Sequence, residues 1–149
     1  MKIQTHSPEE TMRLGQQLAR HLKPGDILCL SGDLGSGKTT LVKGIAKGLK
    51  IKESDVVSPT FVLMNIYEGK LPLYHFDFYR LEDIKEIAAI GYDEFLYGTG
   101  VAVIEWAERL GELMPKERLE VHLHYGNQAE RVIALIPRGE RYKHLMQCL

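Results

Sequence analysis

The sequence predicts an α/β fold, a three-layer sandwich around a mixed central sheet, and three observations carry this prediction. Short apolar runs typical of buried strands alternate along the chain with stretches that have helical periodicity. Two pairs of strand-like segments are joined by short turns, which indicates hairpins in the same sheet. The 149 residues contain no repeats, low-complexity tracts or linkers, so we expect a single domain over 1–149.

The first half of the chain predicts two helices with a buried strand between them. Ser7 with Glu10 three residues later forms a capping-box pattern, and leucines that recur every four residues predict a helix up to about Lys23. The apolar run 27–30 predicts a buried strand, which ends at a glycine-rich loop. A second helix follows that loop, and its apolar face comprises Leu41, Ile45 and Leu49.

The second half of the chain predicts five strands and several short helices. The first two strands and the last two form hairpins, because only the turns EGK and YGNQ separate them. Helices are expected over 81–96, over 106–114 up to Pro115, and near the end of the chain. In chain order, the predicted strands are 61–67, 71–78, 101–104, 119–123 and 132–136.

The composition excludes several classes of protein. With 44% hydrophobic and 26% charged residues, no apolar run near the roughly 20 residues that span a bilayer, and an acidic stretch near the N-terminus, we expect a cytoplasmic protein without membrane association. Cys29 and Cys148 show no metal-ligand spacing and are expected to be free thiols. The formal net charge of −1, without a long basic run, disfavours strong direct binding of nucleic acid.

The segment SGDLGSGKTT, residues 31–40, carries the strongest functional signal. From Gly32 to Thr39 it fits the pattern G-x-x-x-x-G-K-[ST] in full. Glycines let backbone N–H groups approach phosphate oxygens, Lys38 can place its ammonium on the β- and γ-phosphates, and the Thr39 hydroxyl can complete the shell of a Mg²⁺ ion. Because a buried strand precedes the loop and an amphipathic helix follows it, a phosphate cradle is favoured over a simple glycine-rich turn.

Magnesium at such a cradle requires a carboxylate from a strand end, and two candidates compete. Asp77 ends LPLYHFD and Glu105 ends VAVIE, and the more purely apolar second run slightly favours Glu105. Each acid taken alone is equally well explained as a solvated strand terminus. In SPTF, residues 58–61, the hydroxyls of Ser58 and Thr60 are available to a metal or a γ-phosphate, as in a nucleotide switch. The pattern alone favours an ST-turn there.

Other side chains have simpler interpretations. Trp106 is expected to anchor the core, and His75 to pack beside Asp77. His122 and His124 share a strand face without a third ligand nearby in sequence, so a solvated face is favoured over a metal site. The pattern does not separate surface charges from an anion site for three arginines, Arg131, Arg138 and Arg141.

Several motifs together resemble the bacterial TsaE (YjeE) family of ATPases, which acts in tRNA threonylcarbamoyladenosine biosynthesis. In order, the matching pieces are GDLGSGKTT, SPTF, YHFDFYRL, the stretch around EIAAIGYDEF, and VIEWAE. They extend from Gly32 to Glu108 and are far more specific than a P-loop alone. Ala107 stands where the family pattern has proline, and this departure concerns local backbone stiffness more than chemistry.

The resemblance implies a P-loop NTPase-like fold that binds ATP and Mg²⁺. Thr39 and Glu105 map to the magnesium ligands, and Asp77 to the acid near the γ-phosphate and the attacking water. Thr60 maps to the switch-like loop, and Trp106 to a segment required for function. Lys38, Asp77 and Thr60 are therefore the expected catalytic residues. The nucleotide would be held by Gly35, Ser36, Gly37, Lys38, Thr39 and Thr40.

The resemblance also implies the proteins TsaD and TsaB as partners, whose complex installs threonylcarbamoyl on adenosine 37 of certain tRNAs. Hydrolysis of ATP, weak in the chain alone and dependent on the partners, would reset that complex between turnovers. The near-neutral charge agrees with a protein that acts through protein partners and contacts tRNA only indirectly.

Two other functions remain open from the sequence. A small-molecule P-loop kinase would need an acceptor pocket and a mobile lid, and no insertion is long enough to be an obvious lid. A nucleotide-gated binding module with little hydrolysis has the same motifs. A GTPase is disfavoured, because neither Asn65 nor Asn127 opens an N-K-x-D sequence.

Overall fold

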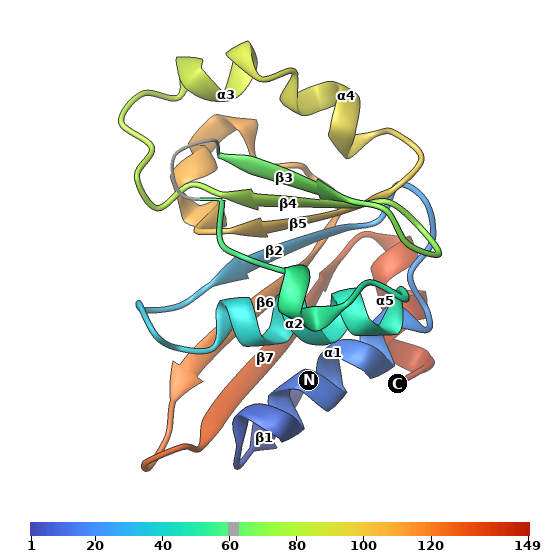
Figure 1. Ribbon diagram of the computed structural model, residues 1–149, viewed down its shortest axis with the longest axis vertical. Coiled ribbons are helices and arrows are strands. Elements are labelled where there is room, and N and C mark those ends of the chain that lie inside the picture. The colour runs from blue at the N-terminus through green and yellow to red at the C-terminus, as the bar shows by residue number, and fades with distance from the viewer. Residues whose placement is uncertain (60–62) are drawn as a thin grey trace.

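A computed structural model gives the structure of residues 1–59 and 63–149, which are the described residues. In this part of the chain, seven strands form one sheet in the order β1-β7-β6-β2-β5-β4-β3 (Figure 1). Strand β2 pairs in parallel with β5 and β6, and β4 with β5, whereas the other three pairs are antiparallel. The predicted mixed sheet is confirmed. Its strands are β1 (Lys2–Thr5), β2 (Ile27–Ser31), β3 (Met64–Tyr67), β4 (Leu73–Asp77), β5 (Val101–Glu105), β6 (Arg118–Tyr125) and β7 (Arg131–Arg138).

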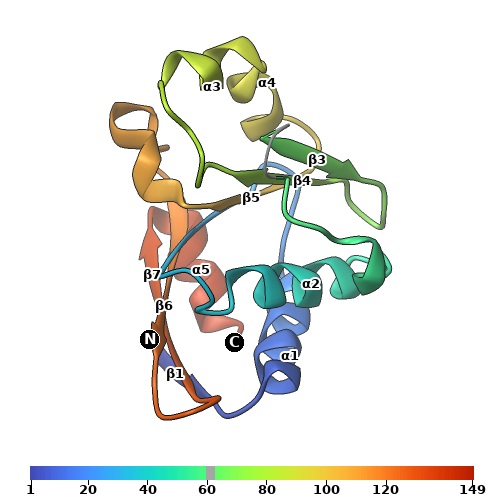
Figure 2. The same ribbon diagram turned by 60° about the vertical axis from the view of Figure 1, so that its left-hand side comes forward.

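Helices cover both faces of the sheet. Helices α1, α2 and α5 lie on one side, and α3, α4 and the 3-10 helix η2 lie on the other (Figure 2), so the three predicted layers are present. No helix in residues 1–59 and 63–149 is both long and apolar enough to cross a membrane. The helices are α1 (Pro8–Ala19), α2 (Lys38–Gly48), α3 (Lys85–Ala89), α4 (Tyr92–Leu96) and α5 (Glu140–Gln147), with 3-10 segments η1 (Glu53–Asp55) and η2 (Ala107–Leu113).

Strand β5 divides its side chains between two hydrophobic cores. Val101 and Val103 belong to the core under α1 and α2, whereas Ala102 and Ile104 belong to the core under α3, α4 and η2. Both faces are covered, which explains why the strand is a continuous apolar run. The period of two places the next residue, Glu105, on the α2 face, where it ends the strand.

Helix α2 is held against α1 at very short range. A Cβ on Gly44 would lie 2.1 Å from the carbonyl oxygen of Met12, and one on Gly15 would lie 2.5 Å from that of Leu41. Only glycine permits this approach of two backbones. The contact fixes the axis of α2 and with it the position of the glycine-rich loop that precedes this helix.

Several predicted helices differ from the structure. The first ends at Ala19, with Arg20 as its C-cap, rather than near Lys23. Pro24 prevents a helix from continuing through Lys23, because proline disfavours helical backbone in the residue before it. The helical stretch before β5 divides in two at Gly91, whose φ of +72° starts α4. The segment after β5 is helical as predicted, in the form of a 3-10 helix with a kink at Gly111, where φ is +53°.

The N-terminal edge strand β1 is absent from the sequence prediction. It has only four residues, of which Ile3 alone is apolar, so its sequence is too short and too polar to show a strand pattern. Its pairing with β7 creates the strand, and local sequence does not. Residues 60–62 lie outside the described residues, so the predicted strand 61–67 is seen only as β3 from Met64 onward.

Candidate nucleotide-binding site

The glycine-rich loop connects β2 to α2 at the carboxyl end of β2. Gly35 and Gly37 have φ of +79° and +105°, a conformation that glycine adopts without steric cost. Gly37 is the N-cap of α2, and no side chain of the described residues caps this helix. The first N–H groups of α2 are therefore available to an anion placed in the loop, where the helix dipole also favours negative charge.

The hairpin formed by β6 and β7 supports the loop from behind. The Tyr125 hydroxyl donates to the carbonyl oxygen of Leu34, and Arg131 Nε donates to that of Ser36 at 3.1 Å. The Arg131 guanidinium lies 4.8 Å from the centroid of the Tyr125 ring. Arg131, which the sequence left open between a surface charge and an anion site, thus binds the loop backbone and preorganises it.

Lys38 is the first residue of α2, and its side chain contacts the backbone of the glycine-rich loop. Its ammonium donates to the carbonyl oxygens of Gly32 at 2.6 Å and Asp33 at 2.9 Å, and lies 4.2 Å from the Trp106 ring centroid. Burial lowers the pKa of the Lys38 ammonium, while nearby carboxylates, Glu105 foremost, raise it. The cation is poised for an anionic ligand in the loop.

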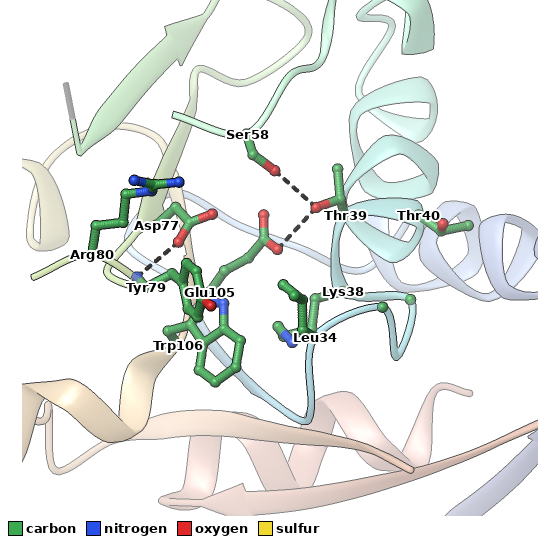
Figure 3. Close-up of a pocket in the computed structure, with 12 residues that line it drawn as sticks. Leu34, Lys38, Thr39, Thr40, Ser58, Asp77, Tyr79, Arg80, Glu105 and Trp106 are labelled. Atoms are coloured by element: carbon green, nitrogen blue, oxygen red, sulfur yellow. Dashed lines mark hydrogen bonds between the residues drawn. The ribbon is translucent and has the colours of Figure 1, made fainter. Parts of the chain in front are cut away.

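Three oxygen-bearing side chains meet at the N-terminal end of α2 (Figure 3). The Thr39 hydroxyl donates to Glu105 Oε1 at 3.0 Å and lies 3.0 Å from Ser58 Oγ. Hydroxyl and carboxylate oxygens are ligands that Mg²⁺ prefers, so this donor set fits the ion. Among the described residues no cluster of three or more ligating acids, histidines or cysteines occurs.

Asp77 lies beside Glu105 at the ends of neighbouring parallel strands, where the two residues are register partners. Its Oδ1 accepts a hydrogen bond from the Tyr79 backbone N–H at 2.9 Å, and the residue is 6% exposed. Burial raises the pKa of the Asp77 carboxyl, as does the neighbouring Glu105, although the Tyr79 N–H lowers it. A buried acid of this kind in a cleft is a candidate for handling a proton or orienting water.

These side chains border a cavity of about 530 Å³, a volume within the range of small-ligand sites. Lysine, hydroxyl and carboxylate groups from four separated segments thus share one space. The lining residues are Leu34, Gly35, Gly37, Lys38, Thr39, Thr40, Ser58, Asp77, Tyr79, Arg80, Glu105 and Trp106.

A family model described as "Threonylcarbamoyl adenosine biosynthesis protein TsaE" matches residues 5–133. The chain belongs to the TsaE family. A TsaE protein of Bacillus subtilis is 45% identical over 99% of this chain and 92% of the relative, and one of Treponema pallidum is 41% identical over 91% and 99%. A crystal structure of Bacillus subtilis YdiB is 40% identical with a TM-score of 0.84, covering 99% of this chain and 91% of that chain.

These comparisons confirm the family resemblance and the fold class inferred from the motifs. The relatives match nearly the whole chain and are themselves nearly covered by it. The TsaE-like motifs from Gly32 to Glu108 all lie inside the matched region.

The TsaE-family segment after β5 has an unusual backbone. Trp106 adopts φ +57° and ψ +42°, a left-handed conformation that is rare for a bulky residue. The sequence suggested a core anchor, and Trp106 is partly buried and packs against the core under α3, α4 and η2. It also lines the cavity, with its ring centroid 4.9 Å from that of Tyr79. Strain of this kind concentrates at ligand sites.

His75 is the residue of this region whose partner the sequence analysis missed. It was expected beside Asp77, and the period of two does place both on one face of β4. The side chain contacts the next strand instead, with Nε2 2.5 Å from Glu105 Oε2. The available signal was the H-F-D spacing taken together with a parallel pairing of the two strand ends.

The remaining predicted residues lie elsewhere or outside the description. Thr60 is outside the described residues. His124 is exposed and His122 contacts Glu120 at 3.2 Å, which agrees with a polar strand face. Of the other two arginines, Arg138 pairs with Glu120 and Arg141 with Asp26, away from the cavity.

Proposed function

We propose that this chain is a Mg²⁺-dependent ATPase that supports the threonylcarbamoyl modification of adenosine 37 in tRNA. The relatives are named for that biosynthesis, which supports the biological role. The observation that carries the biochemical activity is the convergence of Lys38, Thr39, Asp77 and Glu105 on the cavity beside the glycine-rich loop.

In this proposal the phosphates of ATP lie in the loop formed by residues 35–40. Lys38 exchanges its bonds to backbone carbonyls for the β- and γ-phosphate oxygens, and the uncapped N–H groups of α2 donate to the same anion. Thr39 and Glu105 hold the magnesium ion, which when bound neutralises charge on the phosphates.

Asp77 is the proposed acid that orients the attacking water. Its place beside Glu105, at the end of the adjacent strand, supports this role, since the γ-phosphate would lie near the magnesium ion that Glu105 would hold. The rings of Tyr79 and Trp106 lie against each other and border the same cavity. Thr60 stays a prediction from its motif as the third catalytic residue.

We further propose that the output of hydrolysis is read by a complex of TsaD and TsaB, and that tRNA is contacted only indirectly. The loop over 57–59 supports this proposal because it has one side in the site and one in solvent. Ser58 contacts the Thr39 hydroxyl, whereas Val57 is 60% exposed. A change at the γ-phosphate can therefore reach the molecular surface through this loop.

Phosphate release from ATP, measured with and without Mg²⁺ and with and without purified TsaD–TsaB, tests the proposal. We expect slow release by the chain alone, faster release with the partners, and none after chelation of the metal. Reconstituted modification of tRNA should stop at one round when Lys38→Ala replaces the native chain. Phosphate found on an added small-molecule acceptor would instead identify a kinase. Nucleotide binding without any release would identify a gated binding module.

A further inference from the structure

The two carboxylate oxygens of Glu105 are held by different partners. Oε1 accepts from the Thr39 hydroxyl at 3.0 Å and faces the proposed metal position. Oε2 lies 2.5 Å from Nε2 of His75, a side chain with 0% exposure that does not line the cavity. The Glu105 carboxylate is therefore held by a buried residue of the neighbouring strand that does not reach the cavity.

The proton in this contact can be assigned from the partners of the ring. An ionised carboxylate only accepts hydrogen bonds, so Nε2 must donate. The other nitrogen, Nδ1, is buried and has no hydrogen-bond partner among the described residues. A second proton there would leave a buried N–H donor without an acceptor, which is costly. The hydrogen bond to Glu105 thus places a proton on Nε2.

Such a contact bears directly on cation affinity. A glutamate side chain has several rotatable bonds, and fixing them when a metal binds costs conformational entropy. A hydrogen bond already made to Oε2 removes part of that cost and leaves Oε1 turned toward Thr39. Partners of metal-ligating side chains commonly contribute to metal affinity in this way.

We propose that His75 is a positioning residue, which holds Glu105 in the orientation that binds a divalent cation. The inference rests on the proposed function, because Glu105 must be a cation ligand for His75 to act through it. It adds a residue that touches neither nucleotide nor metal. A purely structural His75 would affect stability and leave the cation affinity of the folded chain unchanged.

Two substitutions and one control separate these roles. His75→Ala removes the hydrogen bond, and His75→Gln keeps an N–H donor at similar reach. Leu73→Ala shortens a side chain that is also fully buried and lies on the same face of the same strand, two residues before His75. Leu73 is the register partner of Val101 at the opposite end of β5 from Glu105, so the Leu73→Ala variant matches the packing loss alone.

Mg²⁺ affinity is measured by titration at fixed ATP, and ATP affinity is measured separately in the presence of a chelator. We expect His75→Ala to weaken Mg²⁺ binding by about 10–100-fold. The affinity for ATP in the presence of the chelator should not change. We expect His75→Gln to recover most of that loss and Leu73→Ala to retain wild-type Mg²⁺ affinity despite lower stability. Wild-type Mg²⁺ affinity in His75→Ala, or an equal loss in His75→Gln and His75→Ala, would overturn the proposal.

A second readout needs neither nucleotide nor a variant. Two-bond ¹H–¹⁵N correlation spectra of the wild-type chain report which ring nitrogen of His75 carries the proton. We expect a protonated Nε2 and an unprotonated Nδ1, and the opposite tautomer would overturn the proposed contact. A wild-type chain that binds no Mg²⁺ with ATP overturns the proposed function and this inference with it. Binding in the wild type with no change in His75→Ala overturns this inference alone.

Discussion

Strand β2 has buried charges near both of its ends, and the two groups are built differently. At the amino end, Asp26 accepts from Arg141 at 2.9 and 2.7 Å through both carboxylate oxygens, and from the Lys23 backbone N–H at 2.7 Å. At the carboxyl end, the buried Lys38 ammonium donates to backbone carbonyls, and the buried Asp77 carboxyl accepts from a backbone N–H. Among the described residues, neither of these two groups forms an ion pair.

The difference separates a structural charge from a functional one. Hydrogen bonding to Asp26 raises the pKa of Arg141, so that pair favours the charged form. At the other end burial dominates, lowering the pKa of Lys38 and raising that of Asp77. A fold that buries charges without matched partners gives up stability there and keeps the capacity to bind a ligand.

The largest effect is expected when the ion pair between Asp26 and Arg141 at the amino end of β2 is broken. Arg141→Ala leaves Asp26, whose side chain is 5% exposed, buried without its counter-charge. We expect the free energy of unfolding in urea to fall by about 3 kcal/mol, at the low end for a broken buried pair because Arg141 itself is partly exposed. ATP affinity should not change. Arg138→Ala, which breaks a largely exposed arginine–glutamate contact, is the matched control and should cost no more than about 1 kcal/mol.

Lys38→Ala tests the carboxyl end of β2, where the buried charges lack ion-pair partners among the described residues. This variant should lose ATP affinity and keep its stability. Loss of one charge-assisted contact to phosphate should weaken ATP binding by about 1.5–3 kcal/mol, or roughly 10–150-fold. Stability in urea should not fall, since the ammonium is desolvated and forms no hydrogen bond with a carboxylate among the described residues. Calorimetry of ATP binding gives the first quantity, and Lys47→Ala at the exposed end of α2 is the control. Wild-type affinity in Lys38→Ala would contradict the phosphate cradle.

Asp77→Asn should change how the folding stability of the chain depends on pH. Because burial raises the pKa of Asp77 above its unfolded-state value, folding is penalised whenever the carboxyl is ionised. The penalty is absent below the unfolded-state pKa and develops as the pH rises through the folded-state pKa. The variant should therefore be more stable than the wild type at pH 7, by an amount of order 1 kcal/mol or about 2–4 °C in Tm. Thermal melts should show this gain shrinking toward pH 4, and a gain that is constant with pH would contradict the assignment.

The glycine-rich loop could be predicted from the sequence, because its residues are adjacent in the chain and form one continuous motif. The pairing of Thr39 with Glu105 could be predicted only in outline. The two are 66 residues apart, and the parallel alignment of strand ends brings them together. The contact of His75 with Glu105 depends on the register of β4 and β5, which no local pattern specifies.

The same limit applies to the fold. Strands buried on both faces, such as β5, are legible as apolar runs, whereas the edge strand β1 exists because β7 offers it a partner. The left-handed backbone of Trp106 has no sequence signal, since it is imposed by the segments on either side of it. Tertiary pairing therefore decides the features that the sequence leaves open.

The smallest expected effect concerns how the bound nucleotide changes the affinity of the chain for its proposed partner. We expect ATP to strengthen binding to TsaD–TsaB relative to ADP by about tenfold, which requires only about 1.4 kcal/mol. The link between Ser58 Oγ and Thr39 Oγ1 is one neutral hydrogen bond, so Ser58→Ala should reduce that ratio by about 0.5–1 kcal/mol, or roughly two- to fivefold. Asn65→Ala removes a 3.2 Å contact to the Val57 carbonyl oxygen that does not involve Thr39. It should therefore alter partner affinity equally with either nucleotide. Binding assays that give the same ATP-to-ADP ratio for Ser58→Ala as for the wild type would show that this loop does not report the state of the cradle.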